Sequence, residues 1–592
     1  MCGIAGRAGP RGSWVPDHAV DALAHRGPDA AGVDEFQTGD WSCAVAHTRL
    51  AINDLTGSGD QPLYNEDETL ALVFNGEIYN SPELRQHCVA KGHTFRSRSD
   101  AEVILHLWED EGAAALRKLN GIFAFALQDR QDGTLVLVRD PLGVKPLFWS
   151  ADRDSLWFAS ELQALKATGA PLGSSDVVAL AQFLTFLWIP DPRTPYLAAH
   201  SLPPGTMLTW RQGVHRVQRY ADLVADSAAA PTLTLDVAHQ EFRGRFEEAV
   251  RRQLLSDVPV AIMASGGIDS SLLWWAAKGQ LATAYTIDWS TESGAEGLHE
   301  DTEAVRVLAE NLGTPVCYVP GAAVDVAALP RSGDLFADPA VELCRQIAEA
   351  AHAQGHKVLL SGQGGDELLG GYRRHLLGPL AARVPAGSLG RWTAALLAKT
   401  SSASVSVEYV SRLALSASKG DALSSYMVLC SYSDAEDRAV SLGVSSTEVS
   451  DDVVWEAHRS VFDQTPSHWS LLRRFRALDL AVYLPGLGLA YADRSGMQHS
   501  VEVRVPWLDL ELVRWALQLP DDALIRGMKG KHLSRTLAAD VLPNLIAERP
   551  KRGFGAPVRM LPRSPQRSSR GFRQARYLSS ARAMVDRWVA TT

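Results

Sequence analysis

The segment Ala264-Ser265-Gly266-Gly267-Ile268-Asp269-Ser270-Ser271 decides how the second half of this sequence folds. The apolar run before it, 258–263, has the length of a buried strand, and the residues from Leu272 onward begin a helical pattern. A strand, a Ser/Gly turn and a helix start form an anion cradle, because glycine admits close oxygens and the helix N-terminus is partly positive. The hydroxyls and the carboxylate suit a polyphosphate with Mg²⁺. From these residues alone, an ordinary Gly/Ser turn is the alternative.

Helix and strand patterns alternate on both sides of this segment. No lysine follows its glycines, so it is not the G-x-x-x-x-G-K-[ST] loop. The alternation of helix and strand patterns predicts an α/β domain with a doubly wound, mostly parallel sheet. Ligands of such sheets lie outside the C-terminal ends of the strands. After residue 375 the sequence is largely helical. The expected helices are 241–255, 301–312 and 341–353, and the further strands are 282–289, 315–319 and 357–360.

A second glycine-rich loop follows the strand expected at 357–360. It reads Ser361-Gly362-Gln363-Gly364-Gly365-Asp366-Glu367-Leu368-Leu369-Gly370-Gly371-Tyr372. Two loops at neighbouring strand ends, each with one carboxylate, can hold Mg²⁺ on a pyrophosphate between them. We therefore assign Asp269 and Asp366 as metal ligands, with a helix N-cap as the alternative for Asp366.

Composition limits the class of protein. A chain of 592 residues exceeds one core, and 46% apolar with 21% charged residues is typical of soluble globular proteins. The 58 basic and 68 acidic residues give a net charge of −10, which argues against nucleic acid as the main partner. The most apolar stretch, 180–189, is too short to span a bilayer, and we expect no signal peptide. The cysteines lack metal or disulfide spacing, which favours a reducing cytoplasm; they are Cys2, Cys43, Cys88, Cys317, Cys344 and Cys430.

Cys2 becomes the N-terminal residue if Met1 is removed. Its thiol is then a nucleophile beside an α-amine that can act as its general base. Taken alone, a passive buried thiol is the alternative.

The segments that follow Cys2 carry a resemblance. They are His25-Arg26-Gly27-Pro28-Asp29, 47–52, Phe74-Asn75-Gly76-Glu77-Ile78-Tyr79-Asn80, 97–102 before a helix at 103–109, 121–126 and 139–147. In this order and spacing, the first two hundred residues closely resemble the N-terminal-nucleophile (Ntn) glutaminase domain of class II amidotransferases, an α+β fold.

This resemblance implies a glutamine site. Cys2 would attack the side-chain amide of glutamine, and the Asn75 amide with the Gly76 backbone N–H would stabilise the oxyanion. Arg49 would hold the α-carboxylate. Ile52, Glu77 and Asp100 are assigned to the same site, the two acids at the α-ammonium. Taken singly, Arg49 could be a surface ion pair, Asn75-Gly76 a hairpin turn and Asp100 a helix N-cap.

We expect a glutaminase domain at 2–205, a linker at 206–235 and a synthetase domain at 236–592. The stretch 221–237 is small and polar with Pro231 in its middle, which is typical of a connection. The stretch from Arg559 to Arg587 is rich in arginine, and we expect a solvated helical face or a frayed end rather than a partner-binding tail.

The two glycine-rich loops together resemble the ATP-pyrophosphatase fold of glutamine-dependent asparagine synthetases. The segments 493–497, 501–509, 529–533 and Pro550-Lys551-Arg552-Gly553-Phe554-Gly555 resemble the same family. This resemblance implies that ATP activates a carboxylate as an acyl-adenylate, which ammonia from glutamine converts to an amide. Lys531 would be the catalytic lysine, with a helix-surface lysine as the alternative. The ATP and pyrophosphate site would comprise Met263, Ser265, Gly266, Gly267, Asp269, Ser270, Ile287, Ser361, Gly362 and Asp366.

The sequence departs from the aspartate-specific enzymes at Gln363, where they typically carry glutamate. Glutamine can hydrogen-bond but cannot take a proton from ammonia. The segment 336–342 also lacks the Thr/Arg-rich sequence of an aspartate site. Aspartate is the default acceptor, and Gln363 is the candidate acceptor-site residue. Another carboxylic acid of secondary metabolism, a lasso-peptide-type macrolactam cyclase and a non-catalytic scaffold are the alternatives. Expected partners are glutamine, ATP, Mg²⁺ and the acid, with a homodimer typical of the family.

Overall fold

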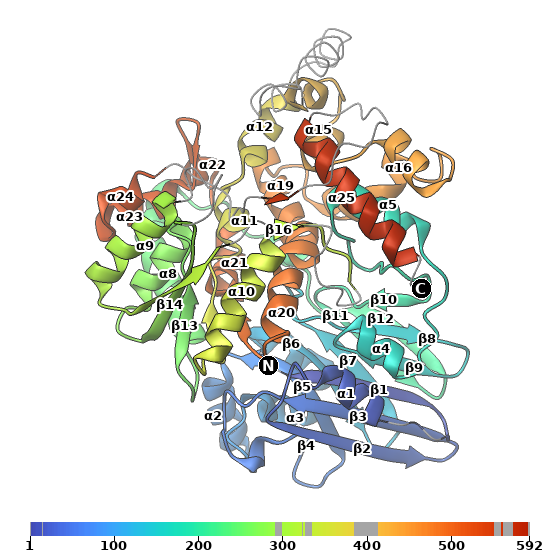
Figure 1. The fold of residues 1–592 in the computed structure, drawn as a ribbon. Helices are drawn as coiled ribbons and strands as arrows, with labels where there is room; N and C mark the ends of the chain where they lie inside the picture. The colour runs from blue at the N-terminus through green and yellow to red at the C-terminus, as the bar shows by residue number, and fades with distance from the viewer. Residues whose placement is uncertain are drawn as a thin grey trace.

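The computed structural model describes residues 2–12, 14, 16–290, 299–321, 324–325, 334–383, 412–549, 558–559 and 572–589. The N-terminal third forms the lower body in Figure 1, drawn in blue to cyan. A parallel sheet and a helical region, drawn from green to red, lie above it.

The N-terminal body has four layers, with two antiparallel six-stranded sheets packed face to face between helices. The period-2 alternation of strands is visible in β5, where Val73 faces the other sheet while Leu72 and Phe74 face the outer helices. The first sheet has the order β10-β8-β9-β1-β3-β2, with β1 (Gly3–Pro10), β2 (Ala30–Thr38), β3 (Trp41–Arg49), β8 (Phe148–Ala151), β9 (Leu156–Ala159) and β10 (Ala199–Ser201). The second has the order β12-β11-β7-β6-β5-β4, with β4 (Leu63–Tyr64), β5 (Leu70–Ile78), β6 (Gly121–Asp129), β7 (Thr134–Arg139), β11 (Thr206–Arg211) and β12 (Val214–Arg219).

Helices cover the outer faces of both sheets. The first sheet is covered by α1 (Asp17–Leu23) and α4 (Leu162–Ala167), and the second by α2 (Ser81–Lys91) and α3 (Val103–Glu111). This order of helix, sheet, sheet and helix agrees with the α+β fold expected from the sequence.

The linker expected at 206–235 is shorter than predicted on its N-terminal side. Residues 206–219 form β11 and β12, and β11 pairs with β7 of the second sheet. Leu208 and Trp210 alternate into the core between the sheets, so burial of their side chains decides the structure of this segment. The connection itself contains α6 (Leu223–Ala228) and leads into α7 (Leu235–Gln253).

The second body contains the predicted doubly wound sheet, and its five strands are parallel. Ile262 faces one apolar cluster while Ala261 and Met263 face the other, so helices bury both sides of the sheet. The strand order is β15-β14-β13-β17-β18, with β13 (Val260–Met263), β14 (Leu281–Asp288), β15 (Val316–Pro320), β17 (Val358–Leu360) and β18 (Glu502–Arg504). The helices between β13 and β17 in the chain are α8 (Ile268–Ala276), α9 (His299–Leu312) and α10 (Ala340–Ala353), and the short α11 (Gly365–Leu369) follows β17.

The described residues after 375 are largely helical, as predicted, apart from short strands. A π-helix, η6 (Asp479–Leu489), lies between two α-helices, and α5 (Val177–Phe186) from the N-terminal half packs into this region. The α-helices are α12 (Arg373–Ala381), α15 (Ala422–Cys430), α16 (Ala435–Leu442), α17 (Asp451–Val454), α18 (Glu456–Gln464), α19 (Leu471–Leu478), α20 (Ala490–Met497), α21 (Leu510–Ala516), α22 (Asp521–Leu524), α23 (His532–Val541), α24 (Asn544–Ala547) and α25 (Phe572–Val589).

Helix α25 contains the described part of the arginine-rich stretch except Arg559, which lies in β21 (Val558–Arg559). Leu578, Val585 and Trp588 are buried in an apolar cluster to which α5 also contributes, so this helix is docked rather than frayed. Within the residues placed by the structure, no helix combines the length and apolarity needed to cross a bilayer.

Candidate active sites

Cys2 lies at the start of β1 and is buried against β5. Its backbone N donates a hydrogen bond to Asn75 Oδ1 at 3.1 Å. The Asn75 side chain is fully buried, and its Nδ2 has no hydrogen-bond partner among the described residues. Burial raises the pKa of the Cys2 thiol, an effect that the Leu50 backbone hydrogen bond and the Arg49 charge oppose. A buried amide donor is therefore held beside the predicted nucleophile.

Asn75 and Gly76 lie inside β5 and do not form a turn, so the hairpin-turn interpretation is wrong. They pair with Ala124 and Phe123 of β6. Gly76 has φ of 155°, and a Cβ there would lie 2.0 Å from the Ile122 carbonyl oxygen. Only glycine fits this approach of the two backbones.

Arg49 ends β3 with its guanidinium buried, which a surface ion pair would not require. Its Nη1 donates to Asp60 Oδ1 at 2.7 Å and to the Thr56 carbonyl at 2.8 Å. Ile52 is buried, and its carbonyl accepts a hydrogen bond from the backbone N of Asp257 at 3.1 Å. The loop after β3 thus connects the predicted glutamine site to the second body.

Glu77 and Asp100 are both buried beside this loop. Glu77 Oε1 lies 3.2 Å from Arg504 Nη2, across the boundary between the bodies. Asp100 Oδ2 accepts a hydrogen bond from the Ile78 backbone N at 2.6 Å. Burial, opposed by this hydrogen bond, raises the pKa of Asp100 to about 6.

The helix N-cap considered for Asp100 belongs to its neighbour. Ser99 Oγ accepts a hydrogen bond from the Ala101 backbone N at 3.3 Å at the start of η2 (Asp100–Glu102). The Asp100 carboxylate is therefore directed to β5.

A buried arginine joins Cys2 to the second body. Arg26 Nε donates to the Cys2 carbonyl at 3.0 Å, and its Nη1 donates to Asp493 Oδ2 at 2.9 Å and to Glu161 Oε1 at 2.8 Å. The segments 25–29 and 493–497 both carry the family resemblance, but the sequence does not predict that Arg26 and Asp493 pair. The only signal in the sequence for this pairing is one charged residue inside each motif.

The predicted phosphate loop connects β13 to α8. Ser265 Oγ and Ser270 Oγ lie 3.0 Å apart across it. Gly266 has φ of 67°, and a Cβ there would lie 2.7 Å from the Asp301 carbonyl. Gly267 precedes the first residue of α8, so the helix N-terminus opens at this loop.

The second glycine-rich loop packs directly against the first. Strands β13 and β17 are parallel neighbours, so their C-terminal ends lie side by side. A Cβ on Gly365 would lie 2.9 Å from Asp269 Cγ, and one on Gly362 would lie 3.0 Å from the Ser270 backbone N. The predicted meeting of the two loops is confirmed.

Lys531 brings the two predicted metal ligands together. It follows the hairpin of β19 (Ile525–Arg526) and β20 (Lys529–Gly530), and its Nζ contacts the carboxylates of both Asp269 and Asp366. Burial favours the neutral amine, but the two carboxylates outweigh it and raise the pKa of Lys531 to about 12. Lys531 is therefore not the surface lysine considered as its alternative.

The donor set at this point fits Mg²⁺, because two carboxylates converge on one cationic group. Asp366 is not a helix cap, since the N-cap of α11 is Gly364. A Cβ on Gly371 would lie 1.9 Å from Asp366 Oδ1 and 2.3 Å from Lys531 Cε. The carboxylate and the lysine occupy space that only glycine leaves.

The remaining predicted nucleotide residues lie at the same sheet edge. Met263 and Ile287, near the ends of β13 and β14, are buried in one apolar cluster. The Ser361 backbone N donates to the Arg504 carbonyl at 2.8 Å, beside Gly362. The motif at 550–555 lies outside the described residues.

Gln363 points toward the π-helix. Its Nε2 donates a hydrogen bond to the Gly488 carbonyl at 3.1 Å. A glutamate at this position could donate this hydrogen bond only in its protonated form.

Comparison with known families gives two matches. The family described as "Glutamine amidotransferase domain" matches residues 1–221, and that described as "Asparagine synthase" matches residues 241–584.

Individual relatives align over nearly the whole chain. "Asparagine synthetase [glutamine-hydrolyzing] 1" of Bacillus subtilis (strain 168) is 30% identical over 563 residues, 91% of this chain and 83% of the relative. "Putative asparagine synthetase [glutamine-hydrolyzing]" of Mycobacterium tuberculosis (strain ATCC 25618 / H37Rv) is 32% identical over 607 residues, 94% of this chain and 88% of the relative. A solved glutamine phosphoribosylpyrophosphate amidotransferase from B. subtilis aligns with 19% identity, a TM-score of 0.29, and coverage of 61% of this chain and 74% of that chain. The last likeness is too slight to carry an argument.

Proposed function

The chain belongs to the asparagine synthetase family, and we propose that it transfers ammonia from glutamine to a carboxylic acid that ATP activates as an acyl-adenylate. As a member of this family it is a carbon–nitrogen ligase that uses glutamine as its amido donor. The observation that carries the proposal is the contact of Lys531 with both Asp269 and Asp366 where the two loops meet.

The glutamine half of the reaction uses the buried N-terminus. After removal of Met1, the α-amine of Cys2 takes the thiol proton, and the thiolate attacks the amide carbon of glutamine. The Asn75 Nδ2 and the Gly76 N–H stabilise the oxyanion, and the buried Nδ2 without a described partner supports this role. The α-ammonium of Cys2 returns this proton to the leaving nitrogen, ammonia leaves, and water hydrolyses the thioester.

Glutamine is held by groups of opposite charge at its two ends. Arg49 binds the α-carboxylate, Glu77 and Asp100 bind the α-ammonium, and Ile52 lies beside them. The burial of all four side chains supports this assignment, because charged contacts gain strength away from water.

The second half of the reaction forms the amide. An oxygen of the acceptor carboxylate attacks the α-phosphorus of ATP, and pyrophosphate leaves into the loop of Ser265, Gly266, Gly267 and Ser270. Ammonia then attacks the acyl carbon, AMP leaves with the bond electrons, and the nitrogen loses a proton. Lys531 keeps its charge at neutral pH and stabilises the phosphate oxygens in both steps.

Mg²⁺ would be held by Asp269 and Asp366, where it would neutralise charge on the polyphosphate. Met263, Ile287, Ser361 and Gly362 would line the adenine and ribose site. Cytoplasmic location and a homodimer remain predictions from the sequence and the family.

We propose aspartate as the default acceptor, with asparagine as the product. The Gln363 amide, held by the Gly488 carbonyl, favours a second candidate, in which the same chemistry acts on another carboxylic acid. A macrolactam cyclase would not need the intact set of Cys2, Arg49, Asn75 and Asp100.

The proposal is tested by pyrophosphate and AMP release from ATP and Mg²⁺, with aspartate or a panel of other acids, and with glutamine or ammonium as nitrogen source. Cys2→Ala should lose the glutamine-driven reaction and keep the ammonium-driven one. Cys43→Ala, which changes another buried thiol, should keep both. Lys531→Met should lose both syntheses and keep glutamine hydrolysis.

Two outcomes would contradict parts of the scheme. Equal loss of both nitrogen sources in Cys2→Ala would exclude separate glutamine and synthetase sites. Release of AMP with another acid but not with aspartate would show that aspartate is not the acceptor. The proposed type of reaction would be unaffected.

A further inference from the structure

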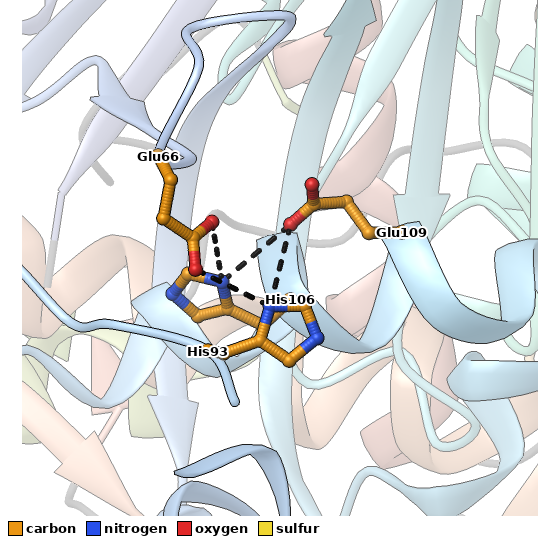
Figure 2. Close-up of side chains that lie close together, drawn as sticks. All are labelled: Glu66, His93, His106 and Glu109. Carbon is orange, nitrogen blue, oxygen red and sulfur yellow. Dashed lines mark hydrogen bonds and ion pairs between the residues drawn. The ribbon is translucent and has the colours of Figure 1, made fainter. Parts of the chain in front are cut away.

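A cluster of four side chains on the outer layer of the glutaminase body takes no part in the proposed reaction. Glu66 lies between β4 and β5, His93 lies after α2, and His106 and Glu109 lie on α3 (Figure 2). One nitrogen or oxygen from each residue lies within 4.8 Å of those of the others. Because His106 and Glu109 are three residues apart on a helix, they share one face.

Four nitrogen–oxygen distances in the cluster are close to the ligand–ligand distances of a tetrahedral metal site. Nδ1 of His106 lies 3.2 Å from Glu66 Oε2 and 3.5 Å from Glu109 Oε2. Nδ1 of His93 lies 3.3 Å from Glu66 Oε1 and 3.8 Å from Glu109 Oε2. Four ligands at zinc distances around a tetrahedral ion lie about 3.3–3.4 Å from one another. The dashed lines in Figure 2 join the carboxylate oxygens of Glu66 and Glu109 to the two histidine rings.

Both ring nitrogens of His106 lie at ion-pair distance from carboxylates, but no well-aligned hydrogen bond to a described residue satisfies them. Its side chain is fully buried, and neither ring nitrogen makes a hydrogen bond with a described residue. Burying an imidazole without a well-aligned hydrogen bond costs free energy. A metal ion at Nδ1 would satisfy it.

Carboxylates surround the cluster as they surround ligating histidines in metalloproteins. The other ring nitrogen of His106 lies 3.7 Å from Glu102 Oε1, and that of His93 lies 3.3 Å from Asp110 Oδ1. Such carboxylate–histidine–metal arrangements fix the tautomer and make the ligating nitrogen more basic. The candidate ligand oxygens are also held in place.

Two hydrogen bonds orient those oxygens. The Asn65 side-chain amide donates to Glu109 Oε1 at 3.0 Å, and the Thr94 backbone N donates to Glu66 Oε1 at 2.8 Å. Each glutamate still presents an oxygen to the histidines.

We propose that Glu66, His93, His106 and Glu109 bind one Zn²⁺ ion. Two imidazoles disfavour Mg²⁺ and Ca²⁺, which prefer oxygen ligands, and the two glutamates neutralise the charge of a divalent ion. Four protein ligands complete a tetrahedron, so the site is structural and not catalytic. A cluster of protonated histidines paired with glutamates, without metal, is the competing interpretation.

The ion would fasten the segment that carries Asp100. Glu102 accepts hydrogen bonds from the backbone N of Arg96 at 2.6 Å and of Ser97 at 2.8 Å. The segment from His93 to Glu102 would thus be held by the ion at His93 and by the Glu102 hydrogen bonds at its other end. Metal loading should stabilise this part of the domain against heat.

The test measures Zn²⁺ binding to the full-length chain after treatment with a chelator. Calorimetry and competition with a chromophoric chelator should give one tight site per chain. His93→Asn and Glu109→Gln should each weaken it at least about tenfold. These residues are chosen because their side chains are 15% and 29% exposed, so the changes are compatible with folding, whereas His106 is buried.

Controls locate the site and identify the geometry. His87→Asn, on exposed α2 surface, should bind Zn²⁺ as the wild type does, and so should Cys2→Ala and Asp366→Asn. Co²⁺ should give the intense visible absorption of a tetrahedral complex in the wild type and lose it in His93→Asn. Zn²⁺ should raise the melting temperature of the wild type and of these three control variants, but not that of His93→Asn or Glu109→Gln. Equal affinity in the wild type and His93→Asn, or a weak octahedral Co²⁺ spectrum, would overturn the proposal.

Discussion

Arg26 and Asp493, 467 residues apart in the sequence, form a fully buried ion pair with Nη1 and Oδ2 at 2.9 Å. The same guanidinium donates to the carbonyl of Cys2, so the predicted nucleophile is positioned in part by the synthetase body. Removing Asp493 leaves the buried guanidinium with Glu161 as its remaining acidic partner, and disturbing such a buried charge cluster is far more costly than losing an exposed pair.

Asp493→Asn should therefore lower the free energy of unfolding by about 3–5 kcal/mol. In a double-mutant cycle with Arg26→Gln, the two losses should be strongly non-additive. Urea unfolding checks this. The exposed pair of Arg243 and Glu247 is the matched control, and its neutralisation should cost less than about 1 kcal/mol. Additive losses at Arg26 and Asp493 would show that the pair does not act as a unit.

Asp100 should impose a pH dependence on glutamine use. Its pKa of about 6 means that the carboxyl becomes protonated as the pH falls through that value, and a neutral group binds the α-ammonium weakly. kcat/KM for glutamine hydrolysis should fall about tenfold per pH unit below the pKa. Asp100→Asn should be slow at every pH and lack this step, and Asp132→Asn, at a surface pair with Arg211, should behave as the wild type. A flat wild-type profile between about pH 5 and 7 would contradict the assignment.

Gly371→Ala should disable the synthetase site alone. The added Cβ would displace Asp366 or Lys531, and a shift of about 1 Å in such groups costs about a hundredfold in rate. AMP formation should fall accordingly, while glutamine hydrolysis continues. Gly244→Ala, in α7 with no atom within 4 Å of the new Cβ, should keep both activities and gain about 0.5–1 kcal/mol of stability. Full synthetase activity in Gly371→Ala would refute the predicted role of this contact.

Glu367 should make the stability of the protein depend on pH. Burial and the neighbouring Asp366 charge raise its pKa from 4.5 to about 7, and its Oε1 accepts a hydrogen bond from the Tyr372 hydroxyl at 2.7 Å. The folded state binds the proton more tightly, so its contribution to stability is complete below 4.5 and is lost as the pH rises through about 7.

Glu367→Gln removes that contribution. The free energy of unfolding of this variant, relative to wild type, should rise by about 3 kcal/mol between acidic and neutral pH. Denaturant titrations at several pH values measure the difference. Glu83→Gln, at an exposed position, should show no such trend. A constant difference for Glu367→Gln would mean that the carboxyl is not held protonated.

The elements around the phosphate loop were predictable because local pattern and tertiary structure agree there. Strands β13, β14, β15 and β17 lie where apolar runs indicated them, since parallel strands buried on both faces need such runs. The meeting of Asp269 and Asp366 followed from the topology alone, because neighbouring parallel strands end at one edge.

Other features depend on partners that are distant in the sequence. Asn75-Gly76 has the composition of a turn, but pairing with β6 overrides that preference. Strand β18 joins the sheet more than a hundred residues after β17, and it is too short to be recognised by its pattern. The histidines and glutamates of the proposed zinc site come from separate elements, and only the His106–Glu109 spacing was visible in the sequence.

Arg504 contacts a predicted substrate-binding residue in each half of the chain. Its guanidinium lies beside Glu77, and its carbonyl accepts a hydrogen bond from the Ser361 backbone N. If nucleotide binding shifts this residue and changes the affinity for glutamine by some factor, glutamine must change the affinity for the nucleotide by the same factor. The two substrates would then be thermodynamically linked before any ammonia is made. The change in the contacts of Arg504, in the three-residue strand β18, would then decide whether each substrate strengthens or weakens binding of the other.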